Sequence, residues 1–189
     1  LSNECRAGID LIGRGSYYPE DAGVCAGLWS MPSIFCMYGA HYVEVEVDIE
    51  TGNVQILKVI SAHDVGKVIN PVTCEGQIEG GIVQGMGPAL FEEMKVGRNG
   101  LILNPSFLDY KVPTSLDVPE IQVLIVEENC VDGPWGAKGI GDITNVPIAP
   151  AIANAIYNAV GVRIKDLPIT QEKILKGIQE KQDHTRPVN

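Results

Sequence analysis

The features that this sequence lacks already exclude several classes of protein. No hydrophobic run among its 189 residues is long enough to span a bilayer, so no membrane-spanning segment is expected. Its five cysteines are scattered and never form a C-x-x-C pair, which disfavours a disulfide framework and a zinc or iron–sulfur site. We therefore expect reduced thiols and a cytoplasmic protein.

Charge and motif content exclude two further classes. Acidic residues outnumber basic residues by 24 to 14, and the net charge of -10 argues against nucleic acid as a partner. The phosphate-binding pattern G-x-x-x-x-G-K-[ST] is absent. His41, His63 and His184 are far apart in the sequence, so we predict that no protein side chains bind a metal directly.

The order of the chain predicts one main domain. Residues 1–40 have no sustained hydrophobic period and are expected to form a loop-rich segment. The domain is placed at residues 41–180, and residues 181–189 are expected to form a polar tail that frays.

A hairpin is the clearest local prediction. Apolar and polar side chains alternate over residues 41–48, as expected for a half-buried strand. Gly52 suits the turn that follows, and residues 54–61 return as the second strand. Further strands are predicted at residues 101–105 and 119–126.

A glycine-rich helix is predicted after the hairpin. Asn70 suits its N-cap and Pro71 its first position, and the helical pattern continues to about Met94. Each glycine inside a helix costs about 1 kcal/mol relative to alanine, so close approach of another element or of a ligand must compensate. Both explanations are open. The glycines form two pairs with a four-residue spacing, Gly76 with Gly80 and Gly81 with Gly85.

A second glycine-rich segment leads into an apolar helix. Residues 136–142 read Gly-Ala-Lys-Gly-Ile-Gly-Asp, and a helix is predicted over residues 147–160 with Gly161 as its C-cap. Asp142 is a carboxylate expected to be buried between a bare loop and an apolar helix, which makes it a candidate functional residue. The alternative is that Asp142 only caps the following helix.

These elements predict an α+β fold. A mostly antiparallel sheet should pack against the glycine-rich helix and the apolar helix. A last helix is predicted to begin after Thr170, which suits its N-cap.

Three segments together resemble the C-terminal part of the large subunit of the molybdenum hydroxylases, the xanthine dehydrogenase and aldehyde oxidase family. With the hairpin, they cover most of the chain from Gly39 to Leu175, and their joint pattern is more specific than any single glycine motif. They are Asp64-Val65-Gly66 with Asn70-Pro71, Gly76-Gln77-Ile78-Glu79-Gly80 and Gln84-Gly85; Tyr110-Lys111-Val112-Pro113-Thr114; and residues 136–142 with the helix that follows.

The resemblance implies a cofactor and a set of site residues. The expected cofactor is molybdopterin with molybdenum, as the cytosine dinucleotide, in a pocket between two halves of a large subunit. Gln77 matches the family's pterin-contacting glutamine, and Gly76, Gly139 and Gly141 are the implied backbone contacts. Asp142 matches the position of the family's catalytic base.

One departure from the family leaves two readings open. The family residue at position 142 is usually glutamate, so aspartate shortens the reach of the carboxylate by roughly one CH₂, and an error near 1 Å can cost about 10²-fold in rate. The chain is therefore either the cofactor-binding part of an active enzyme or an assembly domain without turnover.

The resemblance also implies substrates and partners. A purine such as xanthine is the expected substrate, with aldehydes and nicotinate-like heterocycles as alternatives. The expected partners are the remaining large-subunit segment and subunits that carry iron–sulfur clusters and FAD, within an oligomer. The chain by itself is expected to be an inactive fragment or subunit.

Overall fold

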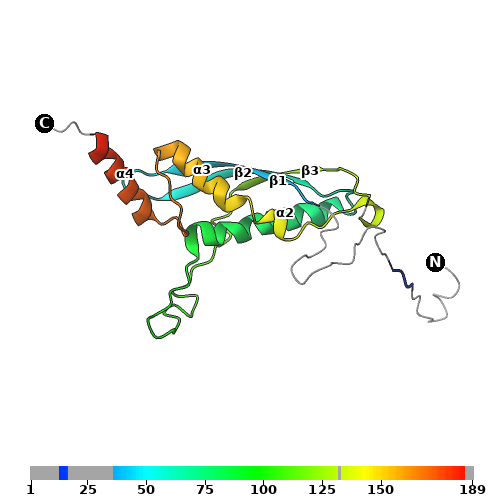
Figure 1. Ribbon diagram of the computed structural model, residues 1–189, viewed down its shortest axis with the longest axis horizontal. Coiled ribbons are helices and arrows are strands. Elements are labelled where there is room, and N and C mark those ends of the chain that lie inside the picture. The colour runs from blue at the N-terminus through cyan, green and yellow to red at the C-terminus, as the bar shows by residue number, and fades with distance from the viewer. Residues whose placement is uncertain (1–12, 17–35, 132, 186–189) are drawn as a thin grey trace, which may run out of the picture.

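The computed structural model describes residues 13–16, 36–131 and 133–185, and it describes only the backbone of residues 184 and 185. The described part is an α+β domain in which helices cover one face of a small sheet (Figure 1). The expected α+β class and the packing of helices on a sheet are thus confirmed. The prediction for residues 1–40 lies almost entirely outside the described residues.

The sheet has three strands in the order β1-β2-β3. β1 (Gly39–Val47) and β2 (Val54–Asp64) form the predicted antiparallel hairpin, and β3 (Glu120–Val126) pairs with β2 in parallel. The sheet is therefore mixed, because the chain crosses over through a helix and a long connection before β3 begins.

The hairpin turn forms as its residues predict. Gly52 has a φ of 71°, a left-handed conformation that glycine adopts without strain. The Asp48 carboxylate accepts a hydrogen bond from the Glu50 N–H at 2.9 Å. The register shifts between Glu44 and Val45 of β1, where Leu57 is an extra, unpaired residue on β2. The side chains of β2 that point into the core therefore lie at even positions before Leu57 and at odd positions after it.

The glycine-rich helix α2 (Pro71–Met86) begins where its cap predicts. The Asn70 side chain accepts a hydrogen bond from the Thr73 N–H at 3.3 Å, and Pro71 occupies the first turn. The prediction that the helix continues to Met94 is wrong, because a short π-helical segment, η1 (Gly87–Phe91), replaces its last turn. Pro88 has no N–H to donate and disrupts the regular helical ladder.

Two regular helices form the C-terminal part of the domain, after β3. α3 (Ile148–Val160) ends at Gly161, which is left-handed with a φ of 72°, as predicted for its C-cap. α4 (Gln171–Thr185) follows Thr170, whose hydroxyl accepts a hydrogen bond from the Lys173 N–H at 3.3 Å. Two short 3-10 helices, η2 (Pro134–Gly136) and η3 (Asp142–Thr144), lie in the glycine-rich segment before α3.

The core lies between the sheet and the helices. α2 and α3 lie on the same face of the sheet (Figure 1). There, inward side chains of the strands pack with the apolar side chains of both helices. The largest apolar side chains of this core that are almost completely buried are Ile78, Ile82 and Met86 of α2, Ile148, Ile152 and Ile156 of α3, and Ile174 of α4.

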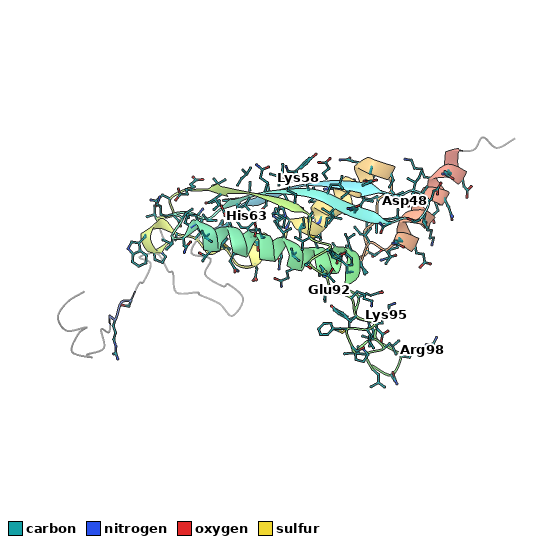
Figure 2. The ribbon with its side chains drawn as sticks, turned by 180° about the vertical axis from the view of Figure 1, so that it is seen from behind. Asp48, Lys58, His63, Glu92, Lys95 and Arg98 are labelled. Atoms are coloured by element: carbon teal, nitrogen blue, oxygen red, sulfur yellow. The ribbon has the colours of Figure 1, made fainter. Side chains whose placement is uncertain are left out.

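Residues 92–118 form an arm that projects from the domain (Figures 1 and 2). The predicted strand at residues 101–105 is wrong: the only strand-like contact found there is an isolated bridge between Val96 and Ile102. The arm is nonetheless ordered by Asn104, which accepts from the Lys95 N–H at 2.9 Å and donates to the Glu93 carbonyl at 2.7 Å. Without a neighbouring strand in the described part of the chain, residues 101–105 cannot form a ladder.

Candidate functional site

The glycine-rich segment after β3 is fixed to the loop that leaves β2. Lys138 donates its backbone N–H to the Val65 carbonyl at 2.9 Å, and Lys67 donates to the Gly136 carbonyl at 2.7 Å. Gly66 has a φ of 62°, and a side chain there would overlap the backbone of Gly136. Only glycine therefore allows the two motif loops to approach this closely.

A buried ion pair locks the same contact. The Lys138 Nζ lies 2.5 Å from Asp64 Oδ2, and the two side chains are only 9% and 7% exposed. Burial alone would raise the pKa of Asp64, but hydrogen bonds from Lys138 and from the Gly66 N–H, together with the Lys138 charge, hold that pKa below its ordinary value. Sequence reasoning missed this pair, because its members are 74 residues apart and no local pattern links them.

Asp142 is the first residue of η3, directly after this anchored segment. Its carboxylate is exposed and makes no hydrogen bond or ion pair with any other described residue, so the expectation of a buried carboxylate is wrong for this chain. The capping alternative also finds no support, since the N-cap position of α3 is Pro147 and no side chain caps it. The Asp142 side chain is therefore available to another molecule.

η3 is held against α2 by a glycine contact. The buried Thr144 packs on Gly81, where any side chain would overlap the threonine, and Gly85 similarly makes room for Ile148. The Thr144 hydroxyl donates to the Gly141 carbonyl at 2.8 Å, which fixes the turn that carries Asp142. Tight packing is thus the reason for one pair of helical glycines.

Packing within the described chain does not explain the other pair of helical glycines. Gly76 and Gly80 are exposed, and apart from the surrounding helix itself no described atom lies within 4 Å of the position that a Cβ would take at either residue. They border a groove of about 520 Å³ between α2 and the entry to β3. Its other lining residues are Glu79, Val83, Val118, Pro119 and Ile121.

The remaining predicted contact residues are divided between α2 and the segment before η3. Gln77 follows Gly76, and its exposed side chain makes no hydrogen bond with the other described residues. Because Gln77 precedes Gly81 by four residues, it lies on the side of α2 that meets η3. Gly139 and Gly141 are exposed in the anchored segment that leads to η3. The contact between Thr144 and Gly81 thus brings together the two segments that carry the five predicted site residues.

Two histidines that are distant in sequence meet near the end of β2 that carries Asp64. His41 Nε2 and His63 Nε2 are 3.0 Å apart, and His63 is only 1% exposed. Burial, with a smaller effect of the His63 charge, lowers the pKa of His41 to about 4, and burial also lowers the pKa of His63. Both imidazoles are therefore neutral in the folded protein at neutral pH.

Acid is expected to destabilise the domain through this pair. The unfolded chain binds protons at histidine near pH 6.5, whereas the folded chain resists protonation at His41 until about pH 4. The stability contributed by neutral His41 is thus present above pH 6.5 and is lost as the pH falls towards 4. Urea midpoints at pH 7.0, 5.5 and 4.5 should decrease in that order. His41→Phe should reduce the dependence, and a parent midpoint that stays constant over this range would contradict the interpretation.

The described residues contain neither a membrane helix nor a metal-ligand cluster. No helix among them is both long and apolar enough to cross a bilayer. Likewise, no group of three or more histidine, cysteine, aspartate or glutamate side chains in this part of the chain is arranged to hold a metal ion.

The family model and the related sequences that match this chain indicate the same family. A family model described as a molybdopterin cofactor-binding domain matches residues 2–119. A putative xanthine dehydrogenase molybdenum-binding subunit of Escherichia coli is 37% identical over 168 residues, which cover 87% of this chain and 22% of that protein. The nicotine 6-hydroxylase large subunit of Paenarthrobacter nicotinovorans is 39% identical over 184 residues, or 92% of this chain and 22% of that protein.

A solved structure agrees with these relatives. The aldehyde oxidoreductase from Desulfovibrio gigas superposes with a TM-score of 0.72 at 33% identity, over 78% of this chain and 16% of that chain. The present chain therefore spans about a fifth of the length of the relatives that it matches. It belongs to the molybdopterin cofactor-binding domain family, within the xanthine dehydrogenase and aldehyde oxidase group of molybdenum hydroxylases.

Proposed function

We propose that this chain is the molybdopterin-binding part of a molybdenum hydroxylase large subunit and supplies the active-site carboxylate, Asp142. The observation that carries the proposal is the bare face of α2 at Gly76 and Gly80, which borders an open groove although two helical glycines should be costly. A ligand that lies against bare backbone explains these glycines, and the neighbouring pair at Gly81 and Gly85 is already explained by packing.

The residues proposed to contact the cofactor suit a large, polar, flat group. Gly76 would let the pterin approach the helix backbone, and the Gln77 amide can donate and accept hydrogen bonds at its edge. Backbone N–H groups at Gly139 and Gly141 can donate to the cofactor's polar groups without interference from a Cβ. When bound, the molybdenum cofactor supplies the redox chemistry of oxidative hydroxylation.

The protein's own contribution to the reaction is a proton acceptor held at a fixed place. Asp142 presents an exposed carboxylate, and general-base help from such a group is worth about 10²–10⁴-fold in rate. Its position depends on the Thr144 contact with α2 and on the Asp64–Lys138 ion pair, which anchors the preceding segment. Lys138 and Asp64 are thus positioning residues, because neither is free to act on a substrate.

The exposed arm supports a role within a larger assembly. The arm exposes apolar side chains that a free domain would be expected to bury, among them Phe107, Leu108 and Leu116, which are 80%, 83% and 95% exposed. The proposed partners are the remaining large-subunit segment and subunits that carry iron–sulfur clusters and FAD. The proposed form of the cofactor is the cytosine dinucleotide, bound between this chain and that remaining segment.

A purine such as xanthine is the proposed substrate. It is supported by the similarity to the Escherichia coli molybdenum-binding subunit, whose name refers to xanthine dehydrogenase. Aldehydes and nicotinate-like heterocycles are the alternatives, supported by relatives whose names refer to an aldehyde oxidoreductase and a nicotine 6-hydroxylase. The residues that orient the substrate would lie mostly outside this chain.

The proposed function is tested by assembly. We expect the purified 189-residue chain to contain little or no molybdenum, because half of the pocket is missing and binding cannot offset the ordering cost. Co-expression with the remaining large-subunit segment and its redox subunits should give near-stoichiometric molybdenum and turnover of one compound in a panel of purines, aldehydes and pyridines. An assembled complex that holds molybdenum but turns over none of these classes would instead assign the chain to a silent assembly role.

A further inference from the structure

We propose that the unpaired edge of β2 at residues 54–57 receives an extended strand from the remaining part of the large subunit. The inference rests on the proposed function only in assuming that such a segment completes the enzyme. It identifies a place where that segment binds, at the end of β2 farther from Asp64 and the predicted cofactor contacts.

The backbone of β2 has vacant hydrogen-bonding positions along this edge. β1 pairs with one side of β2 over its whole length, but β3 pairs with the other side only from Lys58 onward. The Asp48 N–H donates to the Asn53 carbonyl at 2.9 Å, which sets the alternation of the antiparallel ladder. Val54 and Ile56 therefore direct their N–H and C=O groups away from β1, and no strand of the described chain faces them there.

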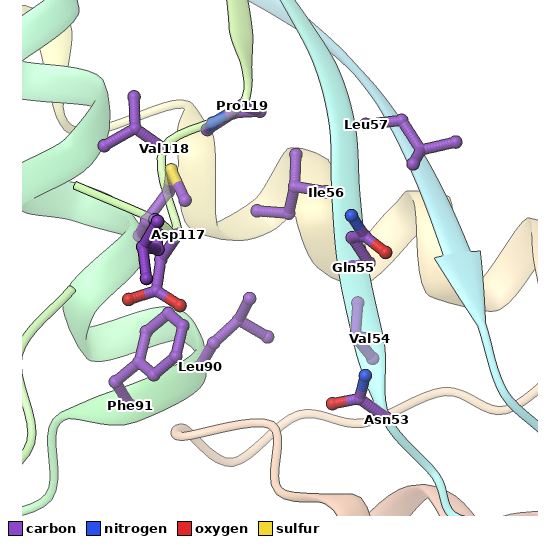
Figure 3. A pocket seen from close by; sticks show the side chains of 12 residues that line it. Asn53, Val54, Gln55, Ile56, Leu57, Leu90, Phe91, Asp117, Val118 and Pro119 are labelled. Atoms are coloured by element: carbon purple, nitrogen blue, oxygen red, sulfur yellow. The ribbon is translucent and has the colours of Figure 1, made fainter. Parts of the chain in front are cut away.

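A groove follows this edge. Its volume is about 380 Å³, and Figure 3 shows the β2 residues on one side and Leu90 and Phe91 of η1 with the chain that leads into β3 on the other. A second groove of about 360 Å³ shares Asn53, Val54, Leu90 and Phe91 and continues to the start of α4. Together they leave room for an extended segment of about four residues, which spans roughly 13 Å.

The chain itself turns away from this position before β3 begins. The Thr114 N–H donates to the Asp117 carboxylate at 2.7 Å, and the Asp117 N–H donates to the Thr114 carbonyl at 3.0 Å, so the end of the arm is folded into a turn. Pro119 has no N–H and cannot donate to a sheet ladder. The residues that precede β3 thus form a wall of the groove instead of extending β3 along β2.

The length of the relatives identifies the occupant. This chain spans 22% of the Escherichia coli relative, so a large subunit of that size has about four-fifths of its length available to supply a strand. Addition of a strand satisfies the backbone of β2, and apolar side chains on its inward face can contact Leu90 and Val118 in the groove. A second copy is disfavoured, because each copy carries a net charge of -10.

Hydrogen exchange in the assembled complex tests the proposal. The amides of Val54 and Ile56 should exchange at least about 100-fold more slowly than those of Glu50 and Thr51 in the hairpin turn, because only a paired strand protects an edge amide. The amides of β2 that β3 already faces are the internal control. Fast exchange at Val54 and Ile56 in a complex that contains molybdenum would overturn the proposal while leaving the proposed function intact.

Two variants separate the groove from the arm. Leu116→Asp changes an exposed residue that lines the groove, and Leu108→Asp makes the same change at an exposed arm residue that does not line it. Leu116→Asp should lower the yield of co-purified partner segment about tenfold and raise exchange at Val54, whereas Leu108→Asp should leave that exchange unchanged. Equal exchange in both variants would overturn the proposal. So would full protection of Val54 and Ile56 in the chain without its partner, which would assign the edge to this chain or a second copy.

Discussion

Asp142→Asn is expected to lower turnover of the assembled enzyme by about 10²–10⁴-fold while leaving its molybdenum content unchanged. Asparagine is nearly isosteric with aspartate, but it carries no charge and cannot accept the proton. The exposed Asp142 carboxylate makes no hydrogen bond or ion pair within the described fold, so its replacement should not alter thermal stability. Turnover, molybdenum content and melting temperature are therefore measured on the same preparations.

Asp142→Glu is the matched control for this prediction. It keeps the charge and extends the carboxylate by one CH₂, which restores the residue usual in the family that the motif resembles. Activity should remain far above that of Asp142→Asn and can exceed that of the parent, since the longer side chain recovers the reach that aspartate lacks. Unchanged turnover in Asp142→Asn would remove Asp142 from the catalytic residues.

Gly76→Leu is expected to lower the molybdenum content of the assembled enzyme by about 10- to 100-fold without destabilising the chain. The new side chain would fill the groove over α2, and overpacking of a site typically costs about 1–3 kcal/mol, which corresponds to that loss of affinity. Nothing in the described structure lies near the new Cβ, and leucine is the better helix former by about 0.5–1 kcal/mol. Metal analysis and urea unfolding of the same variant test both halves of the prediction.

Gly81→Leu provides the contrast on the same helix. A side chain at this position would overlap Thr144, so the substitution should destabilise the domain itself instead of selectively reducing cofactor content. If Gly76→Leu kept its molybdenum, the bare face of α2 would not be a cofactor contact. A loss of stability in Gly76→Leu as large as that in Gly81→Leu would show that both glycines serve packing.

Local signals predicted the regular elements well. These signals act within a few residues, so the local sequence is enough to predict the elements. They are the alternation of residues 41–48, the turn glycine Gly52 and the Asn70-Pro71 cap. Two predictions about regular structure were wrong. Residues 101–105 have the composition of a strand but no partner to pair with, and the helix signal beyond Met86 ignored the missing N–H of Pro88.

The candidate site was predicted in part. The glycine motifs identified the segments that the structure brings together, and these contain Gln77 and Asp142. They could not show that Asp142 is exposed, because burial depends on the elements packed around a residue and not on its sequence neighbours. The assignment of roles to Gln77, Gly76, Gly139, Gly141 and Asp142 stays a prediction that the variants above will test.

The sequence by itself determined the hairpin, the boundaries of most helices and the family, since each depends on backbone preferences or on motifs that are contiguous in the chain. The tertiary structure alone decided which helical glycines pack and which remain bare, because only the position of Thr144 distinguishes Gly81 from Gly76. It also decided the pairing of Asp64 with Lys138. These two residues are 74 positions apart in the sequence. They can meet only because β3 pairs with β2 in parallel and so returns the chain to the end of β2.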